Sequence, residues 1–376
     1  ILPLIAYLAF FCGLMELLIV SGASEKLAKK LSPFFLQIFP SVPKNHESVS
    51  YMTLNFAANF LGLDSAATPF GLKAMQSLQE LNPEKDKASD AQIMFMCLHA
   101  AGLTLIPTSI IGYRAAANAA NPADVMLPCI ITSFIGTIAA MLIVGIRQKI
   151  NFKSATLIVG LMTVVSAIAG LLFYINRLDL VEKNFFTSNL SGLMLIAIIG
   201  ITLIYAFTKE SKFVEQKTTI FDAFVSGAKN GLTTGVTIFP YVMGMLVAIS
   251  FFRNSGLFEI MSDGISFAFS NIGVSKQITD SLPVAMLRPF SSSGSRGFML
   301  DAMSTFGVDS LTGRLSSIFQ CSAETTFYVI AVYFGSINVK NTRYTLGIML
   351  LVDLICVITA IAVASWFFDP TLEIYS

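Results

Sequence analysis

Two stretches of the chain interrupt apolar sequence in the same way, and this pair restricts the possible folds more than any other feature. The first covers residues 55–75 and the second 283–303, and in each an apolar run is broken by small polar residues, Gly and Pro before it resumes. Each is followed by a helix-like segment that is itself broken, at 97–112 and 319–335. A bilayer tolerates irregular backbone only where it lines a cavity or is buried in protein. Paired interruptions in two halves of a membrane chain indicate a transporter's binding site.

The composition is that of a membrane protein. Hydrophobic residues make up 55% of the 376 residues and charged residues only 12%, whereas a soluble domain carries about 25% charged residues. The net charge of +1 argues against a nucleic-acid-binding surface. The five cysteines and two histidines have neither metal-ligand nor disulfide spacing, and no GxxxxGKS or GxxxxGKT loop is present to bind ATP. We therefore expect neither an enzyme nor a cofactor or structural metal.

The hydropathy pattern predicts an all-α polytopic membrane protein. Apolar runs of about 20 residues can cross a bilayer, and they occur at 1–22, 91–118, 123–146, 154–176, 189–208, 221–252, 310–337 and 343–367. The runs at 91–118 and 310–337 are broken. The interrupted stretches, about 48–79 and 277–306, are too polar to span and are predicted to be re-entrant helical hairpins. The amphipathic segments Glu25–Phe39 and Phe258–Phe269 are typical of helices that lie along the membrane interface.

The two halves repeat the same order of elements. An interfacial helix is followed by a hairpin, a broken helix and a span, with an offset that falls from about 234 to about 220 residues. Five spans separate the two interfacial helices, and because five is odd the repeats are expected to be inverted. We divide the chain into a first repeat (1–146), connecting transmembrane helices (147–217) and a second, inverted repeat (218–376). The segment 221–235 has no counterpart in the first half, which predicts a further segment before Ile1.

The distribution of Lys and Arg predicts the sidedness. Most of the basic residues that lie outside the second half's hairpin and broken helix fall on one side, namely Lys26, Lys29, Lys30, Lys44, Lys85, Lys87, Arg147, Lys149, Lys153, Lys209, Lys212, Lys217, Lys340 and Arg343. The other side holds chiefly Arg177, Lys183, Arg253 and Lys276. Positive charge accumulates on the cytoplasmic side. The first hairpin is therefore predicted to be cytoplasmic, and the second hairpin and the C-terminus to lie outside.

Charged residues mark the second interrupted stretch as a candidate substrate site. A charge at the centre of a spanning helix costs about 2.5–3.5 kcal/mol, yet Arg288, Arg296 and Glu324 all fall in apolar surroundings. Glu324 either pairs with one arginine to brace the hairpin, or leaves the arginines to face an anionic solute. A run of serines leads into the resumed helix, whose N-terminus favours an anion, although a plain turn uses the same residue types. The predicted substrate-binding residues of this half are Arg288, Ser291, Ser292, Ser293, Ser295, Arg296, Gln320, Glu324 and Thr325. Gln320, Glu324 and Tyr328 are spaced to share one helix face.

Polar residues of the first half predict the remainder of the site. Asn59, Asp64, Ser65 and Thr68 surround the tip of the first hairpin and are expected to bind the solute. Asn55, Thr104 and Thr108 are assigned to a coupling cation, because broken helices expose oxygen ligands of the kind that hard cations prefer. Tight packing of Asn and Thr in a membrane core explains the same residues equally well. His99 is either a proton relay or, as is commoner, an internally hydrogen-bonded histidine.

Long motifs identify a resemblance. The segments ANFLGLDSAATPFGLKAM and LTLIPTSIIGYRAAANAANP resemble spore maturation protein A, and LRPFSSSGSRGFML and SAETTFYVIAVYFGSINVKNTRY resemble spore maturation protein B. The chain is thus similar to a fusion of the two, within the nucleoside-recognition or gate domain group that also occurs in ferrous-iron permeases and concentrative nucleoside transporters. The resemblance implies two inverted repeats that move as an elevator, with a substrate site at 59–69, 288–297, Thr104 and Glu324. Glu324 approximately matches an acidic residue that binds ribose in nucleoside transporters, whereas the two arginines depart from that pattern.

These observations favour a cation-coupled secondary transporter of a small polar, anionic organic solute in the bacterial cytoplasmic (inner) membrane. Na⁺ or H⁺ is the expected coupling ion, and a homo-oligomer is expected by analogy with other elevator transporters. One alternative is a nucleoside or metal-ion permease, although no Cys, Met or His cluster lines the hairpins as softer metals prefer. Another is a non-transporting membrane scaffold in envelope or spore maturation.

Overall fold

The computed structural model describes residues 2–62, 64–175, 177–178, 180–256, 260, 263–264 and 275–368. These residues form helices joined by loops, together with an isolated backbone bridge between Lys87 and Asn341. The predicted all-helical class is confirmed. The predicted interfacial helix Phe258–Phe269 lies almost entirely outside the described residues, and the acidic tail after residue 368 lies wholly outside them.

The first half contains every predicted element in the predicted order. Its helices are α1 (Leu2–Val20), α2 (Ala23–Ile38), α3 (Glu47–Phe60), α4 (Asp64–Glu80), α5 (Asp90–Ala100), α6 (Thr108–Ala116) and α7 (Met126–Arg147). Helix α2 occupies the predicted amphipathic segment and is bent by 65° from α1. Helices α3 and α4 pack on each other as a hairpin, and α5 and α6 are the two parts of the first broken helix.

The second half repeats the hairpin, broken helix and final helix of the first. Helices α8 (Ala155–Ile175), α9 (Leu180–Thr208) and α10 (Glu210–Glu215) connect the two halves, and α11 (Ile220–Asn254) begins the second half. The second hairpin and broken helix are α13 (Lys276–Leu287), α14 (Ser292–Phe306), α15 (Leu311–Cys321) and α16 (Thr326–Gly335), followed by α17 (Thr345–Phe367). Helices α15 and α16 are separated by residues 322–325, which include Glu324.

Several helices meet the length and apolarity needed to cross a membrane. Within the described residues α7, α8, the 189–208 part of α9 and α17 meet both requirements, and the bent pair α1–α2 adds a fifth span if it is counted as one. The parts of each broken helix are far shorter, with 11 and 9 residues in α5 and α6, whereas about 20 residues are needed to span. The apolar helices are those of a membrane protein, and neither part of either broken helix is long enough to span a bilayer alone.

The local sequence explains where the broken helices begin and stop. The side chain of Ser89 accepts a hydrogen bond from the N–H of Gln92 to cap α5, and Ser310 caps α15 in the same way through Gly313. Helix α5 ends near Gly102, whose φ of +63° suits a residue without a Cβ. A Cβ added to Gly102 would lie 3.4 Å from the Cα of Ala323. The backbone of Gly102 is therefore close to the backbone of the second break. The two breaks therefore meet.

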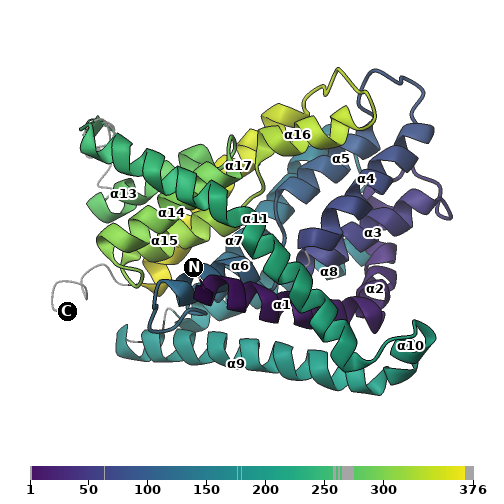
Figure 1. Ribbon diagram of the computed structural model, residues 1–376. Coiled ribbons are helices and arrows are strands. Elements are labelled where there is room, and N and C mark those ends of the chain that lie inside the picture. The colour runs from purple at the N-terminus through teal and green to yellow at the C-terminus, as the bar shows by residue number, and fades with distance from the viewer. Residues whose placement is uncertain are drawn as a thin grey trace.

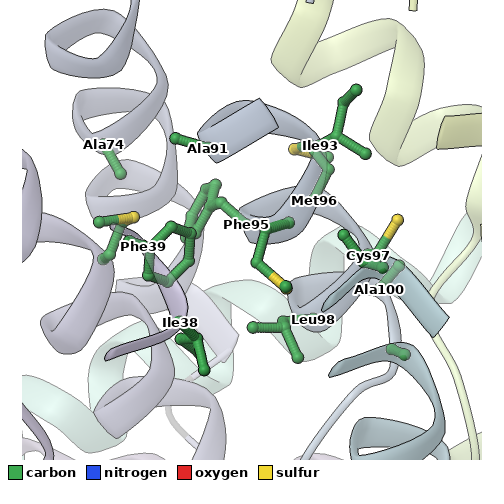
Figure 2. Close-up of a cluster of buried hydrophobic side chains, with 14 of the residues drawn as sticks. Ile38, Phe39, Ala74, Ala91, Ile93, Phe95, Met96, Cys97, Leu98 and Ala100 are labelled. Atoms are coloured by element: carbon green, nitrogen blue, oxygen red, sulfur yellow. The ribbon is translucent and has the colours of Figure 1, made fainter. Parts of the chain in front are cut away.

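The two halves face each other across the molecule. In Figure 1, α13, α14 and α15 form one group and α3, α4 and α5 another, while α16 extends from the centre toward α4 and α5. Helix α6 packs against α1 and α15. Figure 2 shows the buried centre of the group that contains α3, α4 and α5, where Phe95 and Leu98 of α5 lie with Ile38 and Phe39 at the end of α2. Each hairpin thus has an apolar core of its own, and its tip is directed to the region between the groups.

Helices α1 and α11 pack closely along the middle of the molecule. A Cβ on Gly227 would lie 2.5 Å from the carbonyl oxygen of Cys12, and one on Gly231 would lie 2.5 Å from that of Leu8. The later residue of α11 approaches the earlier residue of α1, so the two helices run antiparallel. Small residues spaced four apart allow such close backbone approach in membranes.

Candidate functional site

A polar cavity of about 220 Å³ lies where the two hairpins and the two breaks meet. Its walls come from α3, α4, the α5–α6 break and α6 of the first half, and from the 288–296 turn, the α15–α16 break and α16 of the second half. Both halves contribute because the breaks cross at Gly102 and Ala323. The amide N–H of Glu324 donates to the carbonyl of Ala100 over 2.9 Å, which fixes one break against the other.

Nine of the residues predicted from the sequence line this cavity. They are Asn59, Thr68, Thr104, Thr108, Arg288, Ser292, Arg296, Gln320 and Glu324. Asn55, Ser291, Ser293, Ser295 and Thr325 do not line it. The side chains of Asp64 and Ser65 lie outside the described part of the structure, where only their place at the start of α4 is given.

The predicted residues that do not line the cavity are engaged in holding its walls. Ser291 is the N-cap of α14, where its side chain accepts from the N–H of Gly294, and it also lies 3.4 Å from the hydroxyl of Ser293. The buried Ser295 hydroxyl contacts the carbonyl of Val284 at 2.8 Å and Oε1 of Gln320 at 2.6 Å, which ties the hairpin to the broken helix. Within the hairpin these serines therefore bond to protein groups rather than face a solute.

Arg288 is held by three groups of its own half. Its Nη1 donates to the hydroxyls of Ser292 at 3.2 Å and Thr325 at 3.1 Å, and its Nη2 lies 3.9 Å from a carboxylate oxygen of Glu324. The Arg288 side chain is 11% exposed and that of Glu324 41% exposed. The buried Nε of Arg288 has no hydrogen-bond partner among the described residues. Arg288 therefore braces the turn, while Glu324 lines the cavity with a side chain that is partly exposed.

Arg296 is the second cation of the cavity wall. Its guanidinium carbon lies 5.5 Å from the ring centroid of Tyr113, which is within the range of a cation–π contact. None of the ion pairs found between described residues includes Arg296, whereas Glu324 is already next to Arg288. Among the described lining residues there are therefore two guanidinium groups and one carboxylate, whose formal charges sum to a positive value.

The first half supplies hydrogen-bonding groups in place of charges. The Nδ1 atom of His99 lies 3.0 Å from Oδ1 of Asn55 and 3.0 Å from Nδ2 of Asn59. The Asn55 amide also donates to the carbonyl of Ala67 over 2.7 Å, which links α3 to α4. His99 and Asn59 both line the cavity, and the His99 ring lies 4.9 Å from that of Tyr333. His99 and Asn59 thus form a hydrogen-bonded part of the cavity wall, which Asn55 supports from behind.

Equivalent positions of the two halves carry different chemistry. Counted from the ends of α5 and α15, His99 corresponds to Gln320 and Leu103 to Glu324, and all four line the cavity. Counted from the starts of α4 and α14, Thr68 of the first hairpin corresponds to Arg296 of the second. Among the described lining residues, the arginines and the glutamate all come from the second half, and the first half contributes no Arg, Lys, Asp or Glu.

Some cavity residues were not identified as site residues from the sequence. Tyr113, Tyr328 and Tyr333 line the cavity together with Cys321. His99 also lines it, and the sequence had suggested either a proton relay or an internally hydrogen-bonded histidine at this position. Tyr328 was placed with Gln320 and Glu324 by helical spacing, but these three lie on α16, α15 and the break between them. The break, rather than a shared helix face, brings them together. Tyr113 and Tyr333 each lie within apolar sequence, where an aromatic residue gives no signal of its own.

Charged contacts join the two halves at both ends of α7. Near its first residue, the fully buried Arg114 contacts Asp124 at 2.8 Å and Asp309 at 3.0 Å, and Arg314 contacts Asp124 at 2.8 Å. Near its last residue, Arg343 contacts Asp90 at 2.6 Å, and Gln148 donates to the hydroxyl of Tyr344. We call the first group the buried ion cluster and the Arg343–Asp90 contact the exposed ion pair. Asp90 begins α5 and Asp309 lies in the turn before α15, so the two hairpin ends lie at opposite ends of α7.

Comparison with known proteins identifies the class to which this fold and site belong. The family model described as Gate, nucleoside recognition, matches residues 1–117 and 236–340, which is more than half of the chain. The chain belongs to the Gate family, and the matched ranges include both hairpins and both broken helices. No solved structure matches the chain.

Two Bacillus subtilis proteins are similar to this chain. Spore maturation protein B is 37% identical over 179 residues, which cover 48% of this chain and 95% of that protein. Spore maturation protein A is 36% identical over 140 residues, which cover 37% of this chain and 71% of that protein. The resemblance to both proteins that the sequence motifs indicated is confirmed.

Proposed function

We propose that the chain is a secondary transporter that moves a small polar, anionic organic solute across the bacterial cytoplasmic membrane. The observation that carries the proposal is the polar cavity at the meeting point of two hairpins and two broken helices. Discontinuous helices near the membrane centre form the substrate sites of many secondary transporters. A protein that served only as a scaffold would have no need to bury charged groups around a cavity in a membrane.

The size and charge of the cavity support a small anion. Its volume of about 220 Å³ is below the roughly 300–1,000 Å³ of drug-sized ligand sites. Arg288 and Arg296 outnumber Glu324, and Arg296 is free of the carboxylate that Arg288 contacts. A planar guanidinium group binds carboxylate or phosphate oxygens in pairs. We place the anionic group of the solute at Arg296 and its uncharged polar part at Asn59, Thr68 and His99.

An inverted-repeat arrangement explains the two ends of α7. With 22 residues, α7 is about 33 Å long, which is close to the thickness of the hydrocarbon core. The ends of the hairpins, Asp90 and Asp309, lie at its opposite ends. The antiparallel packing of α1 on α11, and of α7 on α17, is also what inversion would produce. In our proposal the first hairpin opens to the cytoplasm, the second opens outside, and the hairpins move together as an elevator.

The coupling ion is proposed to be Na⁺ or H⁺. Thr104 and Thr108 line the cavity, and the hydroxyl of Ser133 lies 3.4 Å from the carbonyl oxygen of Thr104. Asn55, which the sequence also suggested as an ion ligand, is instead bonded to Ala67 and His99. Among the described cavity-lining residues of the first half, His99 and Tyr113 are the ones that can titrate. The oxygen atoms of Thr104 and Thr108 support Na⁺ as the coupling ion, and the presence of His99 supports H⁺.

The test is ligand binding by the purified full chain. Thermal unfolding is measured with a panel of carboxylates, phosphorylated metabolites and neutral nucleosides, with and without Na⁺ and at two pH values. We expect an anionic solute to stabilise the wild type, and Arg296→Gln to weaken its binding about tenfold because a charge-assisted hydrogen bond is lost. Glu324→Gln is expected to alter binding as well, since Glu324 lines the cavity.

Exposed residues of the same type provide the controls. Arg177→Gln and Glu210→Gln remove the same charges from surface positions and should leave binding unchanged. Uptake of the stabilising solute into proteoliposomes under a Na⁺ or a pH gradient then identifies the coupling ion. If no small solute stabilises the wild type, the transporter proposal fails and a scaffold in envelope or spore maturation is favoured, as the relatives' names suggest.

A nucleoside permease is the second candidate, because the matched family is described as nucleoside recognition. In that case the exposed carboxylate of Glu324 would accept hydrogen bonds from ribose hydroxyls. Neutral nucleosides would then stabilise the protein as well as anions do, and Arg296→Gln would have no effect. A metal-ion permease has less support, since the described residues contain no group of three or more His, Cys, Asp or Glu that could hold a metal ion.

A further inference from the structure

A second cavity, different in character from the first, lies between α2 and α8. It is a half-open groove of about 590 Å³ whose floor is formed by residues of α3, α5 and α7. Phe34 of α2, Phe60 of α3 and Phe134 of α7 are among its lining residues, and the polar exceptions are Lys30 and two threonines. Apolar grooves of this size on a protein surface mark sites that another apolar molecule covers.

Positive charge is concentrated at the α2 side of the groove. Lys30 lines the groove itself, Lys26 lies about one turn before it on the same helix, and Lys29 is its immediate neighbour, with all three exposed. The Nζ of Lys26 lies 5.4 Å from the ring centroid of Tyr205 on α9. An occupant that matches this site carries a long apolar part and an anionic group at one end.

We propose that the groove between α2 and α8 binds one acyl chain of an anionic phospholipid, with the lipid phosphate at Lys30. Basic residues beside clefts between membrane helices recognise anionic lipid headgroups in this way. An extended peptide segment fits poorly, because the apolar walls would leave its backbone N–H and C=O groups without partners. An acyl chain has no such groups and needs only apolar contact. The proposal does not depend on the identity of the transported solute.

The groove adjoins the polar cavity. Leu103, which follows Gly102 in the first break, belongs to the walls of both. Ile38 and Leu98 also line the groove and lie in the core shown in Figure 2. A chain end at the bottom of the groove would therefore contact the first broken helix on the side opposite the solute.

The test compares two lipids and two pairs of variants of the purified full chain. Native mass spectrometry measures the binding of phosphatidylglycerol and of phosphatidylcholine with identical acyl chains. Lys30→Gln removes the charge at the groove, and Lys29→Gln removes an equally exposed charge from the same helix outside it. Gly160→Leu fills the groove, because a Cβ added at Gly160 would already lie 3.4 Å from the Phe34 ring, whereas Gly170→Leu adds the same side chain to open space on α8.

We expect phosphatidylglycerol to be retained in preference to phosphatidylcholine. Lys30→Gln should weaken phosphatidylglycerol binding about fivefold, as the loss of one basic residue near a lipid headgroup predicts, and Lys29→Gln should weaken it much less. Gly160→Leu should remove binding, and Gly170→Leu should retain it. Equal binding of the two lipids, equal effects of the two lysine variants, or a co-purified fatty acid in place of phospholipid would overturn the proposal. If Gly160→Leu fails to fold, the lysine pair decides the question alone.

Discussion

The buried ion cluster and the exposed ion pair allow a direct test of what holds the two halves together. Arg114 lies in the last turn of the first broken helix and Arg343 follows the second, and each contacts residues at or just before the start of the other half's broken helix. Arg114 donates to the carbonyl of Val308 and contacts Asp309, and Arg343 donates to the carbonyl of Ala88 and contacts Asp90. The two arginines differ mainly in burial, since Arg114 is 0% exposed and Arg343 is 30% exposed.

The expected cost of losing each arginine follows from that difference. Removing one partner of a buried pair costs about 3–5 kcal/mol. In Arg114→Met the effect should lie at the lower end, about 3 kcal/mol, because Asp124 keeps its contact with Arg314 and Asp309 is partly in water. Arg343→Met breaks a pair that water screens, so its cost should be about 0–1 kcal/mol.

The free energy of unfolding is measured by denaturant titration in mixed micelles. Trp366, the single tryptophan of the chain, lies near the end of α17 and reports unfolding by its fluorescence. Circular dichroism provides the second probe, so that a transition seen by only one of them is recognised. The Arg114→Met protein should unfold with an equilibrium constant about a hundredfold larger than that of Arg343→Met. Unfolding free energies of the two variants within about 1 kcal/mol of each other would refute the reasoning.

Two further predictions concern packing. A methyl group added by Gly231→Ala would lie 2.5 Å from the Leu8 carbonyl oxygen, so this variant should lose about 1–3 kcal/mol. Gly244→Ala on the same helix meets open space and should be neutral or up to about 1 kcal/mol more stable. If both alanine variants raised the free energy of unfolding, or both lowered it, the close packing of α1 on α11 would be contradicted. The Thr326 hydroxyl donates to Asp353 over 2.6 Å in the interior, so Thr326→Val should cost about 1–3 kcal/mol. Thr359→Val, which loses only a bond to its own helix, is its control, and equal losses from both would show that the Asp353 contact is unimportant.

The sequence predicted the order of elements because each has a strong local signal. The first hairpin was placed at about 48–79, and α3 and α4 cover Glu47–Phe60 and Asp64–Glu80. The breaks near Pro107 and Glu324 were placed correctly, since proline and intramembrane charges are rare within spanning helices. The expectation that Gln320 and Glu324 share a helix face was wrong, because the helix ends at Cys321 between them.

Contacts between distant segments could not be predicted in this way. Arg114 and Asp309 are 195 positions apart, and their pairing follows from the packing of the two halves rather than from either local sequence. The serine run looked like an anion site, but a capping hydroxyl and a hydroxyl that bridges two helices have the same composition. Only the coordinates separate the serines that face the cavity from those that support its wall.

The hydrogen bond from the Glu324 amide to the Ala100 carbonyl has a mechanical consequence. Each break is anchored to the other through main-chain atoms, so neither can rewind into continuous helix without releasing its counterpart. A side-chain substitution leaves that bond in place. Admission and release at the two faces of the cavity would then be steps of a single rigid-body displacement, and the hairpins would not act as two doors that open independently.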